Sequence, residues 1–333
     1  MTRPDSSATH PPHRHGDTPV TSLLTFLRKP WLWAFIAAAV TFAATAAVTQ
    51  AGGFGLGMTA LTFAAFSVLV GIGQMFVITL GPGNTDLSIP ATMTLAGTLA
   101  LKAMAGDPAL IPLGLAIALA SGLGVGVLNY ALIRLLSIPP IIATLSASFL
   151  IQSAAIWSNR GLRVKPPQAL ADFATGSALG VPNVAVVAVV VAALAWVVLE
   201  RALAGRRVLA IGQNLRAARL AGVPVDAVRF ATYVSCAVLA GLAGFLLASF
   251  SGGAALNMGQ EYLLMSIAVV VIGGSSIAGG NSNVPGIWGA SLFMFLIVSM
   301  LNSYGAGAGV RMILTGVIII AIVAAAGGRK VSR

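Results

Sequence analysis

Apolar residues run through almost the whole chain in long, nearly unbroken stretches, and polar residues gather in the short segments between them. A helix needs about 20 apolar residues to cross the roughly 30 Å hydrocarbon core of a membrane. The pattern predicts ten such helices, over residues 31–50, 58–80, 87–105, 110–136, 141–157, 184–200, 228–250, 262–277, 284–303 and 310–326. The expected fold class is therefore all-α: a polytopic membrane helix bundle of about ten transmembrane helices, forming a single domain over residues 30–333.

One interruption in this pattern has two interpretations. The sequence Gly-Pro-Gly-Asn at 81–84 breaks a nearly continuous apolar stretch between residues 58 and 105. It is either a turn at the membrane surface or a re-entrant break within the membrane, because non-helical backbone is tolerated at that depth where protein surrounds it.

The composition agrees with a membrane protein. Of 333 residues, 58% are hydrophobic and 8% charged, whereas about 25% of the residues of an average soluble domain are charged. A soluble globule is therefore excluded. Residues 1–29 are rich in Pro, Ser, Thr and His and contain no long apolar run, so they predict a flexible cytoplasmic tail rather than a cleaved signal peptide.

The basic residues predict the orientation of the bundle. The chain has 19 Lys and Arg against 8 Asp and Glu, a net charge of +11. In a membrane protein such an excess marks cytoplasmic loops rather than a nucleic-acid partner. With a cytoplasmic N-terminus, the inner set is Arg3, Arg14, Arg28, Lys29, Arg134, Arg201, Arg206, Arg207, Arg216, Arg219, Arg229, Arg329, Lys330 and Arg333, and the outer set is Lys102, Arg160, Arg163, Lys165 and Arg311. We therefore expect both termini to be cytoplasmic.

The rarest residues exclude several kinds of chemistry. All three histidines lie in the tail, at His10, His13 and His15, and Cys236 is the only cysteine. Residues 30–333 therefore lack the histidines and cysteines needed for a disulfide framework, a His-based catalytic triad or a Cys/His metal site. No lysine follows a glycine, so there is no Walker A motif for binding nucleotide phosphates. We expect no catalytic residue, no metal site and no cofactor in this chain, and any ATP to be hydrolysed by another protein.

The long inner loop, residues 201–229, predicts a docking element. Asn214 is placed to cap a short helix that ends at Gly222, which Pro224 follows. Small residues lie on or near one face of this helix, and Arg216 and Arg219, three residues apart, share another. The small residues are Ala217, Ala218 and Ala221. This shape suits a groove on a partner; the alternative is a basic surface loop that only fixes the topology.

Asp86 is the clearest polar candidate within the apolar region. A carboxylate near the middle of a span costs roughly 2.5–3.5 kcal/mol to insert, so it normally faces the bundle interior, a wet cavity or a partner. Alternatively, Asp86 lies with Ser88 at a helix end and caps the helix that follows. The outer segment 158–182, with Arg160, Arg163, Lys165 and Asp172, is either a contact for an external protein or a solvated loop.

Four motifs, in order along the chain, resemble those of ribose-type ABC importer permeases, the bacterial inner-membrane subunits for monosaccharide uptake. They are TDLSIPATMTLAG near Asp86, GVGVLNYALIRLLSIPPIIATL around Asn129, GQNLRAARLAGV and IAVVVIGGSSIAGG from Ile267. The third resembles the family's segment for coupling to the ATPase, and the family positions fall on Gly212, Asn214, Ala217, Ala218, Gly222 and Val223. Pro82, a longer approach to Asp86, and Pro90 depart from the family pattern around the aspartate.

The resemblance implies an assembly and a function. Two permease subunits, identical or different, would form a pathway in the inner membrane, two ATP-binding subunits with ATP and Mg²⁺ would dock on the coupling loops, and an extracytoplasmic binding protein would deliver a monosaccharide or related polyol. Asp86, Ser88 and Asn129 are the candidates for the substrate pathway, although for Asn129 a bond to a neighbouring helix is the favoured interpretation. Permeases for branched-chain amino acids or nucleosides, or an ion-coupled carrier, are the alternatives.

Overall fold

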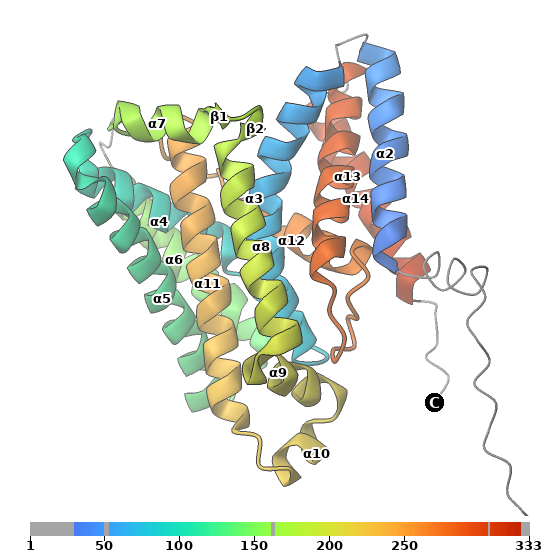
Figure 1. Ribbon diagram of the computed structural model, residues 1–333. Coiled ribbons are helices and arrows are strands. Elements are labelled where there is room, and N and C mark those ends of the chain that lie inside the picture. Colours follow the sequence, from blue (N-terminus) through green and yellow to red (C-terminus); the bar gives the residue numbers. More distant parts are fainter. Residues whose placement is uncertain (1–29, 50–52, 161–163, 306, 328–333) are drawn as a thin grey trace, which may run out of the picture.

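The computed structural model describes residues 30–49, 53–160, 164–305 and 307–327, and its helices form one elongated bundle (Figure 1). The elements are α2 (Pro30–Thr49), α3 (Gly53–Thr79), α4 (Ile89–Met104), η1 (Pro108–Leu110), α5 (Ile111–Leu135), α6 (Pro140–Asn159), α7 (Gln168–Thr175), β1 (Ser177–Ala178), β2 (Val181–Pro182), α8 (Asn183–Arg201), α9 (Leu203–Gln213), α10 (Leu215–Leu220), α11 (Val225–Phe250), α12 (Tyr262–Ile272), α13 (Val284–Ser303) and α14 (Ala308–Gly327). The all-α membrane bundle is confirmed; the predicted tail, residues 1–29, lies outside the described residues.

Each predicted span overlaps one α-helix, but the helices differ in length. Within the described residues, seven helices are long and apolar enough to cross a membrane. The helix α4 has 16 residues and α12 has 11, which at 1.5 Å per residue cover only about 24 and 17 Å. The predictions of regular spans over 87–105 and 262–277 were therefore too long: each of these two segments is partly non-helical.

Non-helical backbone, largely in turns, adjoins both short helices. Residues 80–88 lead into α4, and residues 273–283 lead out of α12. The second stretch is bonded to the end of α3, since the Gly280 amide donates to the Thr79 carbonyl (3.0 Å) and the Thr79 and Ser282 hydroxyls hydrogen-bond (2.7 Å). Pairing satisfies backbone groups that could not be left open in a membrane. The interruption at 81–84 is thus an exposed turn at Pro82–Gly83, followed by a largely buried break.

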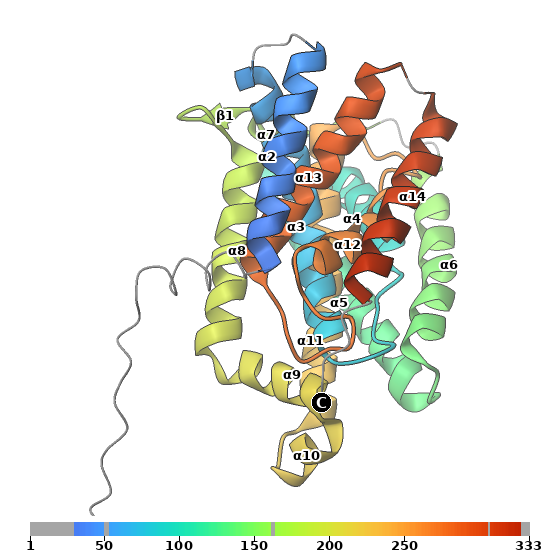
Figure 2. The ribbon, with the colours of Figure 1, turned by 90° about the vertical axis from the view of Figure 1, so that its right-hand side faces the viewer.

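The bundle has two distinct ends. The helices α9 and α10 project from one end, and α7 with the β1–β2 hairpin lies across the other (Figure 1). In the hairpin Ser177 pairs with Pro182. The helix α2 begins and α14 ends toward the α10 end, as expected if both termini share one side of the membrane (Figures 1 and 2).

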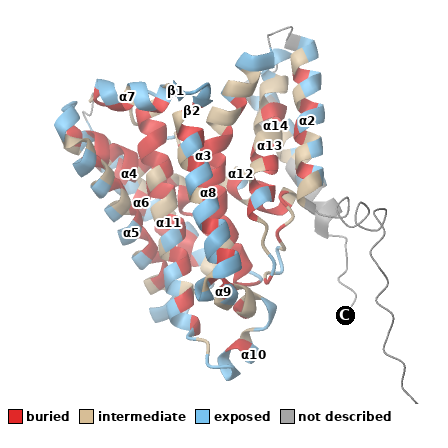
Figure 3. Cartoon of the chain, in the orientation of Figure 1, coloured by how far each residue is buried: buried red, intermediate tan, exposed pale blue. Residues whose placement is uncertain are grey.

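Close backbone packing holds the helices together. Gly122 and Gly126 of α5 face the backbone of α11 at Ala237 and Val234, where a Cβ atom would overlap it. Such contacts allow helices to approach where the hydrophobic effect cannot drive association. Burial is concentrated along α3 and α11, and the outer faces of α5, α6 and α8 are exposed, as expected for helices that contact lipid (Figure 3).

Two α-helices were not predicted. The helix α7 lies within the outer segment, where Arg160, Lys165 and Asp172 are exposed; Arg163 lies outside the described residues. The helix α9 precedes the predicted docking helix, and it buries Gly205, Val208 and Ile211. The three-residue spacing of these positions was the signal that could have predicted α9.

Candidate functional site

The predicted residues Asp86, Ser88 and Asn129 meet at the break before α4. Asp86 Oδ1 accepts hydrogen bonds from the Ser88 amide (2.8 Å) and the Ser88 hydroxyl (2.6 Å). Asn129, on α5, donates from Nδ2 to the Ser88 hydroxyl (2.8 Å) and to both carboxylate oxygens of Asp86 (3.3 Å each). All three residues have no exposed surface. The sequence therefore identified a real cluster, built across two segments 41–43 residues apart.

This cluster stabilises the start of α4. A buried carboxylate is tolerated only when hydrogen bonds replace its hydration, and here backbone, hydroxyl and amide donors do so. The carboxylate also lies beside the N-terminus of α4, whose first residue is Ile89, where the helix dipole favours negative charge. This geometry agrees with two of the alternatives given by the sequence: Asp86 lies at the start of a helix, and Asn129 bonds to a neighbouring segment of the bundle. A direct substrate contact stays a prediction, because the three side chains are covered in this structure.

A second group of hydrogen bonds, which the sequence did not predict, holds residues 84–87 of the break. The Asp86 amide donates to Gln74 Oε1 on α3 (3.1 Å), and the Leu87 amide donates to the Thr144 hydroxyl on α6 (3.1 Å). Tyr233 of α11 donates to Asn84 Oδ1 (3.2 Å). The break is therefore tied to four helices at once. Gln74, a buried amide within an apolar span, was the available signal.

The predicted docking helix is present as α10. Asn214 caps it by accepting a hydrogen bond from the Ala217 amide (3.0 Å), and Gly222, with φ of +77°, follows its end. A left-handed residue at this position is the usual helix stop. Arg216 and Arg219 are both exposed, and Arg219 also lines a cavity described below.

One part of the docking prediction was wrong. Ala217 and Ala221 are exposed, four residues apart on one face, but Ala218 is buried against the protein's own core. Successive helical residues point about 100° apart, so the face of Ala218 turns toward the bundle. Sequence reasoning also missed Leu220, whose side chain is 90% exposed.

Gly212 joins the docking segment to the break. A Cβ atom at Gly212 would overlap both the Thr79 carbonyl oxygen and the Gly280 amide nitrogen. The neighbouring Gln213 donates to the Gly280 carbonyl (3.2 Å). The end of α9, the end of α3 and the loop after α12 therefore meet backbone against backbone.

Two short helices with adjoining non-helical segments, in a bundle of long apolar helices, are features found in membrane transport proteins. Comparison with known proteins is consistent with this class. The chain belongs to the family described as the branched-chain amino acid transport system permease component, whose model matches residues 56–323.

Several curated relatives are permeases of import systems. The Autoinducer 2 import system permease protein LsrD of Salmonella typhimurium is 29% identical over 258 residues, covering 75% of this chain and 76% of the relative. The LsrD protein of Photorhabdus luminescens is 30% identical over 261 residues, covering 75% and 76%. A probable ABC transporter permease protein of Sinorhizobium fredii, y4mJ, is 30% identical over 263 residues, covering 76% and 75%. No solved structure matches.

These findings confirm the resemblance to ABC importer permeases. The chain is the permease component of an ABC importer and a multi-pass protein of the bacterial inner membrane. Permeases of this family work with an ATP-binding subunit and a substrate-binding protein.

Proposed function

We propose that this permease carries a monosaccharide or related polyol inward by alternating access, driven by ATP hydrolysis in a separate subunit that binds α10. The observation that carries the proposal is the backbone contact of Gly212 with Thr79 and Gly280, because it connects the docking segment to the end of α3 and to the loop after α12. In this proposal ATP and Mg²⁺ bind to the partner subunit.

The proposed topology has ten crossings with both termini cytoplasmic. In this topology the helices α4 and α12 complete their crossings through the non-helical segments 80–88 and 273–283. The α10 end carries Arg134, Arg201, Arg206, Arg207, Arg216, Arg219 and Arg229, and the positive-inside rule assigns such an end to the cytoplasm. The α7 end then faces the extracytoplasmic binding protein.

The transport step follows from the two breaks. When ATP draws the coupling helices of two permease subunits together, the strain passes through Gly212 to the ends of α3 and α12. The hydrogen bonds of the Asp86–Ser88–Asn129 cluster hold the start of α4 against α5 while the non-helical segments move. The second permease subunit, identical or different, supplies the other half of the pathway.

The interior favours a neutral, hydroxylated solute. Apart from Asp86, the buried polar side chains in the described residues are hydroxyls and amides of Thr, Ser, Asn, Gln and Tyr. Such groups suit the hydroxyls of a sugar, whereas an amino acid needs partners for two charges. The relatives named for autoinducer 2 import support a small solute of this kind, and branched-chain amino acids are the competing class because the family description names them.

A ligand screen of the cognate binding protein tests the substrate class. Monosaccharides, polyols, branched-chain amino acids and nucleosides are each added, and the melting temperature of the binding protein is recorded. A ligand present at 100 times its Kd stabilises the folded state by about 2.7 kcal/mol. We expect a shift with a monosaccharide or polyol. A shift confined to branched-chain amino acids or to nucleosides would overturn the assignment.

A further inference from the structure

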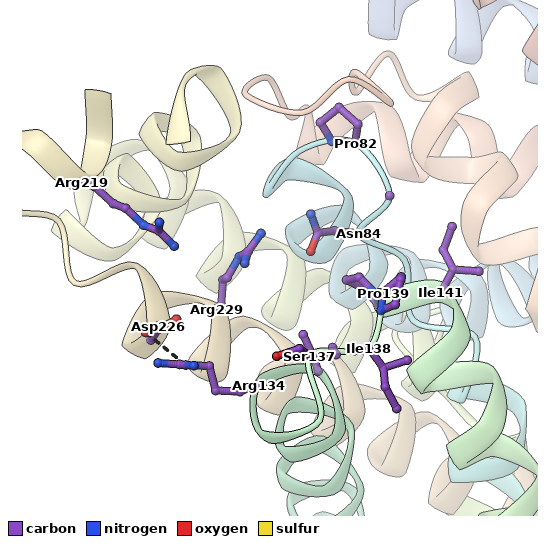
Figure 4. Close-up of a pocket in the computed structure, with 13 residues that line it drawn as sticks. Pro82, Asn84, Arg134, Ser137, Ile138, Pro139, Ile141, Arg219, Asp226 and Arg229 are labelled. Atoms are coloured by element: carbon purple, nitrogen blue, oxygen red, sulfur yellow. Dashed lines mark ion pairs between the residues drawn. The ribbon is translucent and has the colours of Figure 1, made fainter. Parts of the chain in front are cut away.

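A cavity of about 600 Å³ opens beside α10, separate from the Asp86 cluster (Figure 4). Its walls come from the turn after α3, the end of α5, the start of α6, α10 and the start of α11. Apolar residues form one side, including Ile133, Ile138 and Ile141, and charged residues form the other. The volume lies within the range of about 300–1,000 Å³ that is typical of small-molecule sites.

The charges in this cavity do not balance. Three arginines and one aspartate line it: Arg134, Arg219, Arg229 and Asp226. Asp226 is already engaged, since Arg134 Nε lies 3.3 Å from its Oδ2 and the Tyr130 hydroxyl donates to its Oδ1 (3.2 Å). Two cations, Arg219 and Arg229, therefore remain without a facing carboxylate among the lining residues.

Arg229 supplies a second, independent sign of a missing ligand. Its Nε atom is shielded from solvent and has no hydrogen-bond partner in the described structure. A buried donor without a partner is costly, and such groups are normally satisfied by an unseen water, ion or ligand. Figure 4 shows the Arg219 and Arg229 guanidinium groups extending into the same space, with Asn84 on the opposite wall.

We infer that this cavity binds a phosphate group, carried by a small cytoplasmic solute or by a lipid headgroup, between Arg219 and Arg229. The planar guanidinium fork donates in pairs to phosphate oxygens, and these charge-assisted bonds are among the strongest in proteins. The apolar wall would cover the body attached to the phosphate. Because Arg219 belongs to α10 and Arg229 to α11, the bound group would join the docking helix to the bundle. This inference concerns a site outside the proposed transport pathway and does not depend on the identity of the transported solute.

The test uses the full chain in nanodiscs of phosphatidylcholine. Binding of inorganic phosphate and of glycerol 3-phosphate is measured by titration calorimetry for the natural protein and for Arg219→Gln, Arg229→Gln and Arg216→Gln. Arg216 is the matched control, because it is an exposed arginine of the same helix that does not line the cavity. In a second arm, phosphatidylglycerol retained from mixed nanodiscs is counted by native mass spectrometry.

We expect either the soluble phosphates or phosphatidylglycerol to bind. The affinity should be about tenfold weaker in Arg219→Gln and Arg229→Gln and unchanged in Arg216→Gln. The melting temperature of each variant should equal that of the natural protein. Binding of the soluble phosphates identifies a solute site, and retention of phosphatidylglycerol alone identifies a lipid site. Absence of binding in both arms, or an equal loss in Arg216→Gln, would overturn the inference.

Discussion

Replacing Leu220 with aspartate is expected to abolish ATP-driven uptake while leaving the folded permease intact. The leucine side chain is 90% exposed at the end of α10, so no packing inside the bundle is lost. In the assembled importer it would enter an apolar groove of the ATPase, where burying a leucine contributes about 1.5–3 kcal/mol. A carboxylate there adds a desolvation penalty, so we expect the affinity for the ATPase to fall at least about 100-fold.

The measurement is co-purification of the tagged permease with its ATPase, together with substrate uptake in vesicles. Leu179→Asp is the matched control for ATPase binding, since Leu179 is also fully exposed but lies in the hairpin at the opposite end of the bundle. Normal ATPase binding and uptake by Leu220→Asp would show that α10 is not the anchoring surface.

Gly212→Ala is expected to reduce transport more than tenfold and to destabilise the bundle. The added methyl group would overlap the Thr79 carbonyl oxygen on one side and the Gly280 backbone on the other. Neither neighbour is a flexible side chain, so the three backbones must separate and the Gly280–Thr79 hydrogen bond (3.0 Å) is lost. Overpacking of this kind typically costs 1–3 kcal/mol, and contact with rigid backbone on two sides places this variant near the upper end, about 3 kcal/mol.

Thermal melting and uptake are both measured for this variant, with Gly124→Ala as its control. Gly124 lies in α5 and a Cβ atom there would meet nothing within 4 Å, so the same substitution should be neutral or slightly stabilising. If Gly212→Ala melts and transports like Gly124→Ala, the backbone contact does not carry the coupling.

The sequence predicts the bundle well because lipid imposes one strong rule, that a crossing segment is apolar and helical. It does not predict where a crossing becomes non-helical, since Leu80 and Leu87 look the same in a helix or in an extended segment. The loop after α12 is instead held by a contact across about 200 residues, the hydrogen bond between Thr79 and Gly280. The helix α9 was missed because its buried face is narrow. Only three of its residues, Gly205, Val208 and Ile211, are buried.

The site was partly predictable for chemical reasons. Asp86 and Asn129 stand out because polar groups are rare and costly in the membrane, so their presence indicates a partner. Which groups they meet depends on the fold, and the ties from Gln74 and Thr144 to the backbone at 86–87 have no local signature. The exposure of Leu220 and the burial of Ala218 likewise depend on how α10 is rotated against the bundle.

The most direct test of the account is the side of the membrane on which α10 lies. Cys236 is the only cysteine of the chain and is buried, so Arg216→Cys and Asp172→Cys place single reactive thiols at opposite ends of the bundle. A membrane-impermeant maleimide should label Asp172→Cys in spheroplasts and Arg216→Cys only in inside-out vesicles. Labelling of Arg216→Cys in spheroplasts would contradict the account, because a cytoplasmic ATPase could not reach a helix on the outer surface.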